Sequence, residues 1–329
     1  MATIKDIASK AQVSVCTVSR YLNGKIKIRP DTEARIQAAI KELGYIPNTV
    51  AKSLKTSTSQ NVALVIPTIN NSYFSEITAG IDAVLRKEKY ALFIFQHYNK
   101  ADVELQVIRK LIENRIAGAI FVGLPQGIGN YKAFQELNKN GIALVFANRT
   151  FEPGPYPLVF SDYREGGRQA AGHLLELGYK KIGIISGFKN HPESDNRLEG
   201  CLSRLKEGGV TVDPANIDYG CFDHELAGEI ALRLAEQGVE AIFALSDLMA
   251  VGALKALEGK GIRIPEDIAL IGFGNTLHAR LCSPELTSID IQSRQVGSKS
   301  AEVLLKLIKG KAVDLISILS TKLVRREST

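Results

Sequence analysis

From residue 61 onward, short and almost wholly apolar runs alternate with longer segments of mixed polarity, and this alternation constrains the fold more than any other feature of the chain. The runs have the length of strands, and such uniformly apolar strands are typical of parallel sheets covered on both faces. The segments between them, such as 102–115 and 247–261, are expected to be crossover helices. The runs lie at 61–67, 91–96, 118–123, 142–148, 158–162, 181–187, 240–247 and 268–274.

The part of the chain after residue 60 has 269 residues. A core of that size is expected to form two doubly wound lobes rather than one sheet. Ligands of doubly wound sheets bind at the carboxyl ends of the strands, so two lobes predict a binding cleft between them. The segment SILSTKLVRRES, residues 317–328, is expected to form a further strand.

Three short helices are predicted before residue 46. Ser14 can cap the second of them, and Pro30 suits the first position of the third. Helices this short need one another to bury a core, and a helix–turn–helix at the front is typical of a small DNA-binding domain, here over 1–46. The three helices are expected over 4–11, 13–24 and 30–43.

The second of these helices carries residues that its core does not need. At 100° per residue, Val18 and Leu22 form a buried stripe. Val15, Cys16 and Arg20 fall on a separate arc. We expect that arc to contact another molecule rather than the protein's own core.

The positive charge of the chain is confined to the same region. Residues 1–60 contain ten Lys or Arg and four Asp or Glu, whereas the other 269 residues contain 31 of each sign. An excess of basic residues on one small segment is typical of a surface that binds nucleic acid.

A connecting segment is predicted over 47–60. Asn48 can cap a helix of about two turns that would be marginal in water on its own. The polar stretch TSTSQ that follows is typical of a flexible linker. This segment is therefore expected to be a hinge helix with a linker.

Several classes of protein are excluded by what the sequence lacks. It has no apolar run near the roughly 20 residues that span a bilayer and no apolar core of a secretory signal, so a membrane role is not expected and a cytoplasmic location is. The four cysteines have no regular spacing, which favours free thiols. No nucleotide-binding, metal-binding or hydrolase motif appears, so we expect a binding protein without a cofactor or metal rather than an enzyme.

The chain resembles the LacI/GalR family of bacterial repressors over essentially its whole length, and its first 74 residues are most like the purine repressors of that family. The resemblance implies a homodimer that binds a pseudo-palindromic operator in double-stranded DNA and a small effector bound between the lobes. It rests on MATIKDIASKAQVSVCTVSRYLNG, ELGYIPN, AKSLKT, SDLMAVGAL, IPEDIALIGF and PELTSI.

The resemblance also implies which residues contact DNA. The base-contacting positions of the family fall on Val15, Cys16 and Arg20, with Arg20 suited to guanine and the other two to a thymine methyl. The phosphate-contacting positions fall on Ser14, Thr17 and Asn23. Leu54 matches the minor-groove wedge of the family, with Lys55 beside it. A solvated Arg20, or a Leu54 that only packs within the hinge, is the alternative interpretation.

For the effector, the resemblance points to residues of the two lobes. Tyr73 and Phe74 match an aromatic platform, and Arg197 matches a pocket arginine, although an exposed i,i+4 ion pair would explain Arg197 as well. Further candidates at strand ends are Asn148, Asp162, Phe222, Ser246, Asp247 and Asn275.

Position 274 departs from the family, which usually has an aspartate there. Gly274 offers no side-chain acceptor for paired hydroxyls. This absence predicts an anionic or acceptor-rich effector rather than an ordinary hexose.

The resemblance implies lobes that exchange segments near 161, 291 and 318. Lobe 1 would comprise about 61–160 and 291–317, and lobe 2 about 161–290 and 318–329. Two other functions remain open at this point. One is the same DNA-binding role with a protein co-effector or no cleft ligand, and the more distant one is a solute-binding protein of transport.

Overall fold

The computed structural model falls into two units, Met1–Ser59 and Gln60–Thr329. Each unit is described by itself. In the described part of the chain, no helix is both long enough and apolar enough to cross a membrane. The described residues are 2–22, 28–45, 59–125, 131–149 and 155–329.

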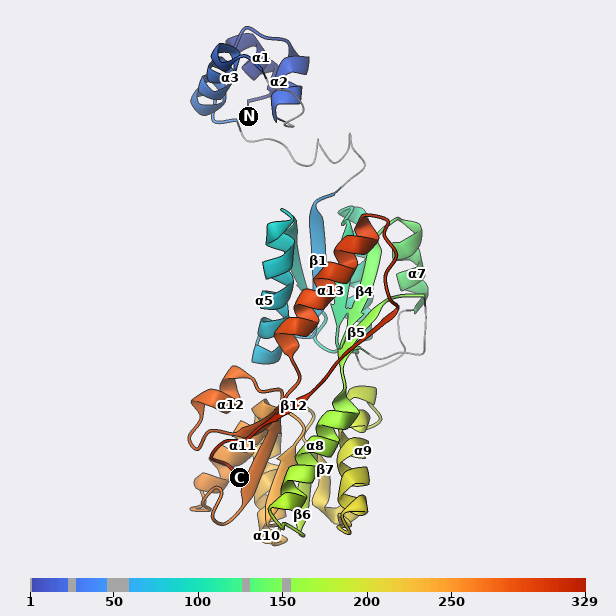
Figure 1. Ribbon diagram of the computed structural model, residues 1–329, viewed down its shortest axis with the longest axis vertical. Helices are drawn as coiled ribbons and strands as arrows, with labels where there is room; N and C mark the ends of the chain where they lie inside the picture. Colours follow the sequence, from blue (N-terminus) through green and yellow to red (C-terminus); the bar gives the residue numbers. More distant parts are fainter. Residues whose placement is uncertain (1, 23–27, 46–58, 126–130, 150–154) are drawn as a thin grey trace. The chain divides into compact units, whose positions relative to one another are not determined.

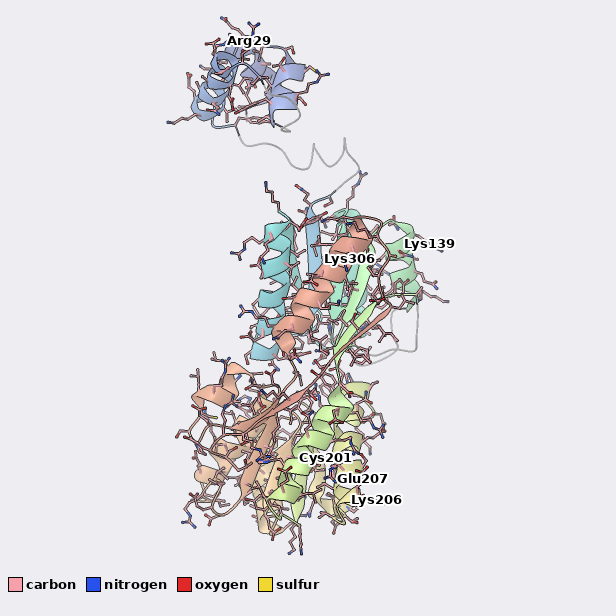
Figure 2. All side chains as sticks on the ribbon, in the orientation of Figure 1. Arg29, Lys139, Cys201, Lys206, Glu207 and Lys306 are labelled. Carbon is pink, nitrogen blue, oxygen red and sulfur yellow. The ribbon has the colours of Figure 1, made fainter. Side chains whose placement is uncertain are left out.

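The first unit contains the three predicted helices around one small core. Its first helix begins with a capping box, in which Thr3 and Asp6 exchange hydrogen bonds that also lower the pKa of Asp6. Arg29 precedes the third helix without a side-chain capping bond (Figure 2). The helices are α1 (Ile4–Lys10), α2 (Val15–Leu22) and α3 (Pro30–Glu42). Their buried residues are Ile7, Ala8, Ala11, Val18, Ile36 and Ala39.

The second unit contains two six-stranded sheets, which confirms the predicted pair of doubly wound lobes (Figure 1). Its strand pairs are parallel except for β10 with β12. The first sheet has the order β11 (Ile316–Leu319), β5 (Leu158–Ser161), β4 (Ala143–Ala147), β3 (Gly118–Val122), β1 (Asn61–Ile66), β2 (Ala91–Gln96). The second has the order β12 (Lys322–Val324), β10 (Thr287–Asp290), β9 (Ala269–Phe273), β8 (Ala241–Ala244), β6 (Ile182–Ser186), β7 (Ile217–Tyr219).

Helices cover the two faces of each sheet because the strand residues are apolar on both sides. In the first sheet, Val62 and Leu64 pack under α5 (Ser72–Lys87) and α13 (Ser293–Ile308). Ala63 and Val65 pack under α6 (Ala101–Glu113) and α7 (Tyr131–Lys139). The second sheet is covered by α8 (Tyr163–Glu176), α9 (Pro192–Glu207), α10 (His224–Glu236) and α11 (Asp247–Glu258).

The chain crosses between the sheets three times, after β5, after β10 and between β11 and β12 (Figure 1). The crossing segments bond to one another. Ser161 Oγ donates to the Ile291 carbonyl, and Gln292 Nε2 donates to the Ser320 carbonyl at 2.7 Å. The last crossing occurs at 320–321 because Leu319 still pairs with Ser161 in the first sheet.

Three details of the strands differ from the sequence-based expectation. Strand β2 is an edge strand with Phe93 and Ile94 each 46% exposed, so an apolar run did not mean cover on both faces there. The segment 317–328 is not one strand but parts of β11 and β12, which belong to different sheets. Strands β7 and β10 were not predicted, because three or four residues carry too little pattern.

All four cysteines are free, as their irregular spacing predicted. Cys201 lies on α9 in the second lobe (Figure 2), and burial raises the pKa of its thiol to about 12. Cys16 is exposed on α2.

Candidate functional site

Helix α2 presents the predicted base-contacting residues to solvent. Val18 is fully buried in the core of the first unit, while Val15 is 43% exposed and both Cys16 and Arg20 are exposed. A valine that is left in water at the first position of a helix has no packing role in its own domain. The arc predicted from the helical periodicity is therefore present and accessible.

Ser14 and Thr17 lie at the N-terminus of the same helix. Ser14 Oγ accepts from the Thr17 backbone N–H at 3.0 Å, which confirms the predicted cap, and lies 2.8 Å from Thr17 Oγ1. Asn23, Leu54 and Lys55 fall outside the described residues, as does the predicted hinge except for its last two positions.

A cavity of about 230 Å³ lies between the two lobes of the second unit. Its walls come from the residues that follow β1, β2, β3, β6, β7, β8 and β9, so it lies where the carboxyl ends of the strands meet. It is smaller than the roughly 300–1,000 Å³ of pockets for drug-sized ligands. Aromatic residues of its lining are Tyr73, Phe74, Phe188, Phe222 and Phe273.

Six of the nine predicted effector residues line this cavity, namely Tyr73, Phe74, Arg197, Phe222, Ser246 and Asp247. Ser246 also caps α11, where its hydroxyl accepts from the Met249 backbone N–H at 3.2 Å. Residues from α5 in the first lobe and from α9 and α11 in the second are thus brought to one place.

The other three predicted effector residues do not line the cavity, because each is engaged within the protein. Asn148 Nδ2 donates to the Tyr73 hydroxyl at 2.6 Å, so Asn148 lies behind the aromatic platform. Asp162 caps α8, and Asn275 Oδ1 accepts from Arg326 at 2.5 Å.

Arg197 is buried in the second lobe, which excludes the exposed ion pair. Only 5% of Arg197 is exposed, and its Nη1 donates to the Leu245 carbonyl at 2.7 Å. Its guanidinium carbon lies 4.2 Å from the ring centroid of Tyr163 and 4.5 Å from that of Phe273. Its Nε is buried and has no partner among the described residues. Arg197 is therefore held in place with one donor to spare.

The tight packing of α8 against α9 fixes the position of Arg197. A Cβ atom on Gly167 would lie 2.1 Å from the Arg197 carbonyl oxygen, and one on Gly200 would lie 2.0 Å from that of Arg164. Only glycine at both positions permits this approach of the two backbones.

The carboxylate of Asp247 lies beside Gly274. A Cβ atom on Gly274 would be 3.3 Å from Asp247 Oδ2, so the cavity has a carboxylate close to the place where the family usually has one. Asp247 accepts from Thr276 N and from Ser288 Oγ, both at 2.6 Å. Burial raises its pKa, and those hydrogen bonds oppose the rise. Gly274 has φ +130°, where a side chain is strained, so an aspartate would not fit there unchanged.

Two cavity residues were not predicted from the sequence. His191 precedes α9 and Glu193 lies in its first turn; they are 7% and 9% exposed. Burial raises the pKa of Glu193, while His191, Arg197 and Arg149 oppose the rise. A Glu four residues before an Arg resembles a surface pair, and only the position of Pro192 at the start of a helix hinted otherwise.

The aromatic platform belongs to a hydrogen-bonded group that joins the lobes. The Tyr73 hydroxyl lies 3.2 Å from that of Tyr163 on α8. Burial raises the pKa of Tyr73 well above its usual value and that of Tyr163 to about 12, so both phenols are protonated at neutral pH. A second contact between the lobes is Ser72 Oγ to His278 Nδ1, at 2.8 Å.

The chain matches two family models, one for each unit. The model for bacterial regulatory proteins of the lacI family matches residues 3–48, and that for the periplasmic binding protein-like domain matches residues 171–329. The basic N-terminal domain is thus of a kind that a solute-binding protein of transport does not need.

Similar proteins cover the whole chain. The transcriptional repressor CytR of Escherichia coli (strain K12) is 32% identical over 333 residues, which is 100% of this chain and 96% of CytR. The repressor PurR of Haemophilus influenzae (strain PittEE) is 32% identical over 94% of this chain and 92% of PurR. The complex of the regulator CelR with cellobiose has a TM-score of 0.73 and 27% identity, with both chains covered in full.

These relatives are named as transcriptional repressors and regulators, in agreement with the expectation of a regulator rather than an enzyme. The identity with CytR extends over both units and so includes the helix–turn–helix and the two-lobe core. The chain therefore belongs to the LacI family of bacterial regulatory proteins, as a DNA-binding transcriptional regulator with a ligand-binding core.

Proposed function

We propose that this protein represses transcription as a homodimer on a pseudo-palindromic operator, and that a small uncharged ring compound bound between its lobes sets its operator affinity. The observation that carries the proposal is the cavity at the carboxyl ends of the strands, where aromatic rings surround buried polar atoms without partners. Buried polar groups of this kind normally have a hydrogen-bond partner. A ligand would supply it, which favours a small effector over an empty cleft or a protein co-effector.

The exposed face of α2 is proposed to contact bases. Arg20 can donate two hydrogen bonds to a guanine, and Val15 and Cys16 can contact a thymine methyl. Ser14 and Thr17 at the helix N-terminus are suited to a phosphate. From the resemblance alone, Asn23 is assigned to phosphate, and Leu54 and Lys55 to the minor groove.

The charges of the cavity argue for an uncharged ligand. Arg197 is its one arginine or lysine among the described residues, and Glu193 and Asp247 are two buried carboxyl groups. An anion would have to approach both of them, and the expectation of an anionic effector rested on Gly274 without knowledge of Asp247. Rings such as Phe222 and Phe74 suit the apolar face of a sugar or a base.

The homodimer is proposed to form through the β2 side of the core. Ile69, Phe93, Ile94 and Tyr98 are 46–58% exposed there. The Ile69 backbone N–H donates to Gln96 Oε1 at 2.9 Å, which holds the loop after β1 against the end of β2. On the second lobe, α12 (Leu277–Leu281) adds two exposed leucines, and the Ser72–His278 bond joins it to α5. Large apolar residues gathered on two lobes are typical of an interface.

Replacing Phe93 with glutamate is expected to convert the dimer to a monomer, because a charge would be buried at the interface. Sedimentation velocity measures the change. The matched control is Ile318→Glu on β11, the opposite edge of the same sheet, where the side chain is 58% exposed. An unchanged dimer in Phe93→Glu, or a monomer in Ile318→Glu, would contradict this choice of surface.

The effector site is tested with Arg197→Met, which keeps the length of the side chain and removes its donors. A thermal-shift screen of sugars, nucleosides and sugar phosphates first identifies a ligand, since a ligand at 100 times its Kd adds roughly 2.7 kcal/mol of stability. We expect Arg197→Met to weaken that ligand roughly ten- to hundredfold through the lost charged hydrogen bond.

The readout that belongs to regulation is the ratio of operator affinities with and without the ligand. Binding and operator affinity are reciprocally linked, so the ratio should approach one in Arg197→Met at a ligand concentration that saturates the wild type. Arg204→Met, two turns further along α9 and outside the cavity lining, is the control. An unchanged ratio in Arg197→Met would show that the effector acts elsewhere.

A further inference from the structure

His191 connects the two lobes across the cavity. It is the residue that caps α9 in the second lobe, and its Nε2 lies 3.1 Å from the carbonyl oxygen of Leu124, which follows β3 in the first lobe. Both residues line the cavity. A ligand in the cavity is therefore adjacent to a direct hydrogen bond between the lobes.

This contact fixes the tautomer of the imidazole. A backbone carbonyl oxygen can only accept, so Nε2 must carry the hydrogen. A neutral imidazole has one N–H, so its Nδ1 is then an acceptor. Nδ1 of His191 is buried and has no partner among the described residues. It therefore requires a donor from outside the protein.

Glu193 supplies a second acceptor at the same wall. Its Oε1 is buried without a partner among the described residues, and Glu193 follows His191 by two positions at the start of α9. The imidazole acts on the carboxyl group electrostatically, so the two side chains lie near each other. On the other side, Arg197 Nε is a donor that has no partner there either. Two acceptors and a donor suit the hydroxyls of a sugar better than an anion.

We infer that His191 Nδ1 and Glu193 Oε1 form an acceptor pair for ligand hydroxyls, and that donation to Nδ1 holds the imidazole in the tautomer that bridges the lobes. The inference rests on the proposed effector site and names its ligand as an uncharged sugar of pentose or hexose size. Protonation of Nδ1 in the absence of ligand removes the acceptor without breaking the bridge. A sugar hydroxyl is therefore selected by both residues at once.

The tautomer is tested without any ligand. The full-length protein has five histidines, and labelling them with ¹⁵N in the ring lets the His191 resonances be assigned by their loss in His191→Gln. We expect the neutral Nε2–H form at mildly alkaline pH. The Nδ1–H form would overturn the acceptor pair while leaving the proposed effector site intact.

The ligand class is tested by calorimetry with D-ribose, D-glucose, D-galactose and D-fructose and their phosphate esters. We expect at least one free sugar to bind more tightly than its ester. Tighter binding of the ester would overturn the inference but not the effector site, whereas no binding by any compound would count against both.

Two substitutions at position 191 separate the bridge from ligand recognition. Glutamine can still donate to Leu124 O but has no acceptor at the place of Nδ1, so sugar affinity should fall roughly ten- to hundredfold. Asparagine keeps an acceptor near Nδ1 and is too short for the bridge, so it should bind sugar better than the glutamine variant but give a smaller change in operator affinity.

Glu193→Gln should weaken the free sugar and strengthen its phosphate ester, because the negative charge is removed. Glu199→Gln, on the same helix but 60% exposed in its side chain and outside the lining, is the control and should change neither. Wild-type sugar affinity in both His191→Gln and Glu193→Gln would overturn the inference.

Discussion

Replacing Arg149 with methionine is expected to lower the free energy of unfolding of the core by about 3–5 kcal/mol, the largest effect we predict, because an uncompensated carboxylate would remain buried. Arg149 and Glu104 form a bidentate ion pair in which neither side chain is exposed. The guanidinium carbon of Arg149 also lies 5.1 Å from the ring centroid of Phe134 and 5.5 Å from that of Phe146. Methionine replaces the packing of the arginine stem but not its charge.

The measurement is equilibrium urea unfolding followed by far-UV circular dichroism, since the chain has no tryptophan. Arg168→Met is the control, because its bidentate pair with Glu207 is partly exposed and should contribute only about 0–1 kcal/mol. Adding Glu104→Gln to Arg149→Met should restore most of the loss. Equal losses in Arg149→Met and Arg168→Met would contradict the argument from burial.

Replacing Arg20 with alanine is expected to weaken operator binding by about 1–3 kcal/mol in each half-site and to relax the preference at one base pair. The reason is that a guanidinium which donates to a guanine is specific for that base, whereas a charge near the phosphates is not. Fluorescence anisotropy on single-base operator variants measures both effects. Arg35→Ala on α3, whose side chain is 43% exposed beside Asp31, should weaken all variants slightly and equally. A uniform loss in Arg20→Ala would instead mean that Arg20 contacts only the backbone.

The sequence predicted the fold well where the pattern was long. The alternation of apolar runs indicated strands such as β1 and β9, and helical periodicity placed Val15, Cys16 and Arg20 on an exposed arc. Edge strands were harder, because Phe93 and Ile94 on β2 are as apolar as core residues although nothing within the described chain covers them. The division of 317–328 between two sheets depends on contacts with β5 and β10, which no local pattern reports.

The cavity was predicted in part for a similar reason. Tyr73, Phe74 and Arg197 were accessible through the resemblance, and the cavity contains them. Asn148 and Asp162 also lie at strand ends, but their side chains bond within the protein, and a sequence does not show which partner a polar group finds. His191 and Glu193 were missed because His, Pro and Glu before a helix look like an ordinary exposed cap.

The central claim is that this chain recognises a two-fold symmetric operator through α2, and selection of binding sites from random double-stranded DNA tests it most directly. Wild-type protein should enrich a pseudo-palindromic sequence with a guanine in each half-site, and Arg20→Ala should enrich the same sequence without a preference at that position. Enrichment of no sequence, or of an asymmetric one that Arg20→Ala leaves unaltered, would contradict the account.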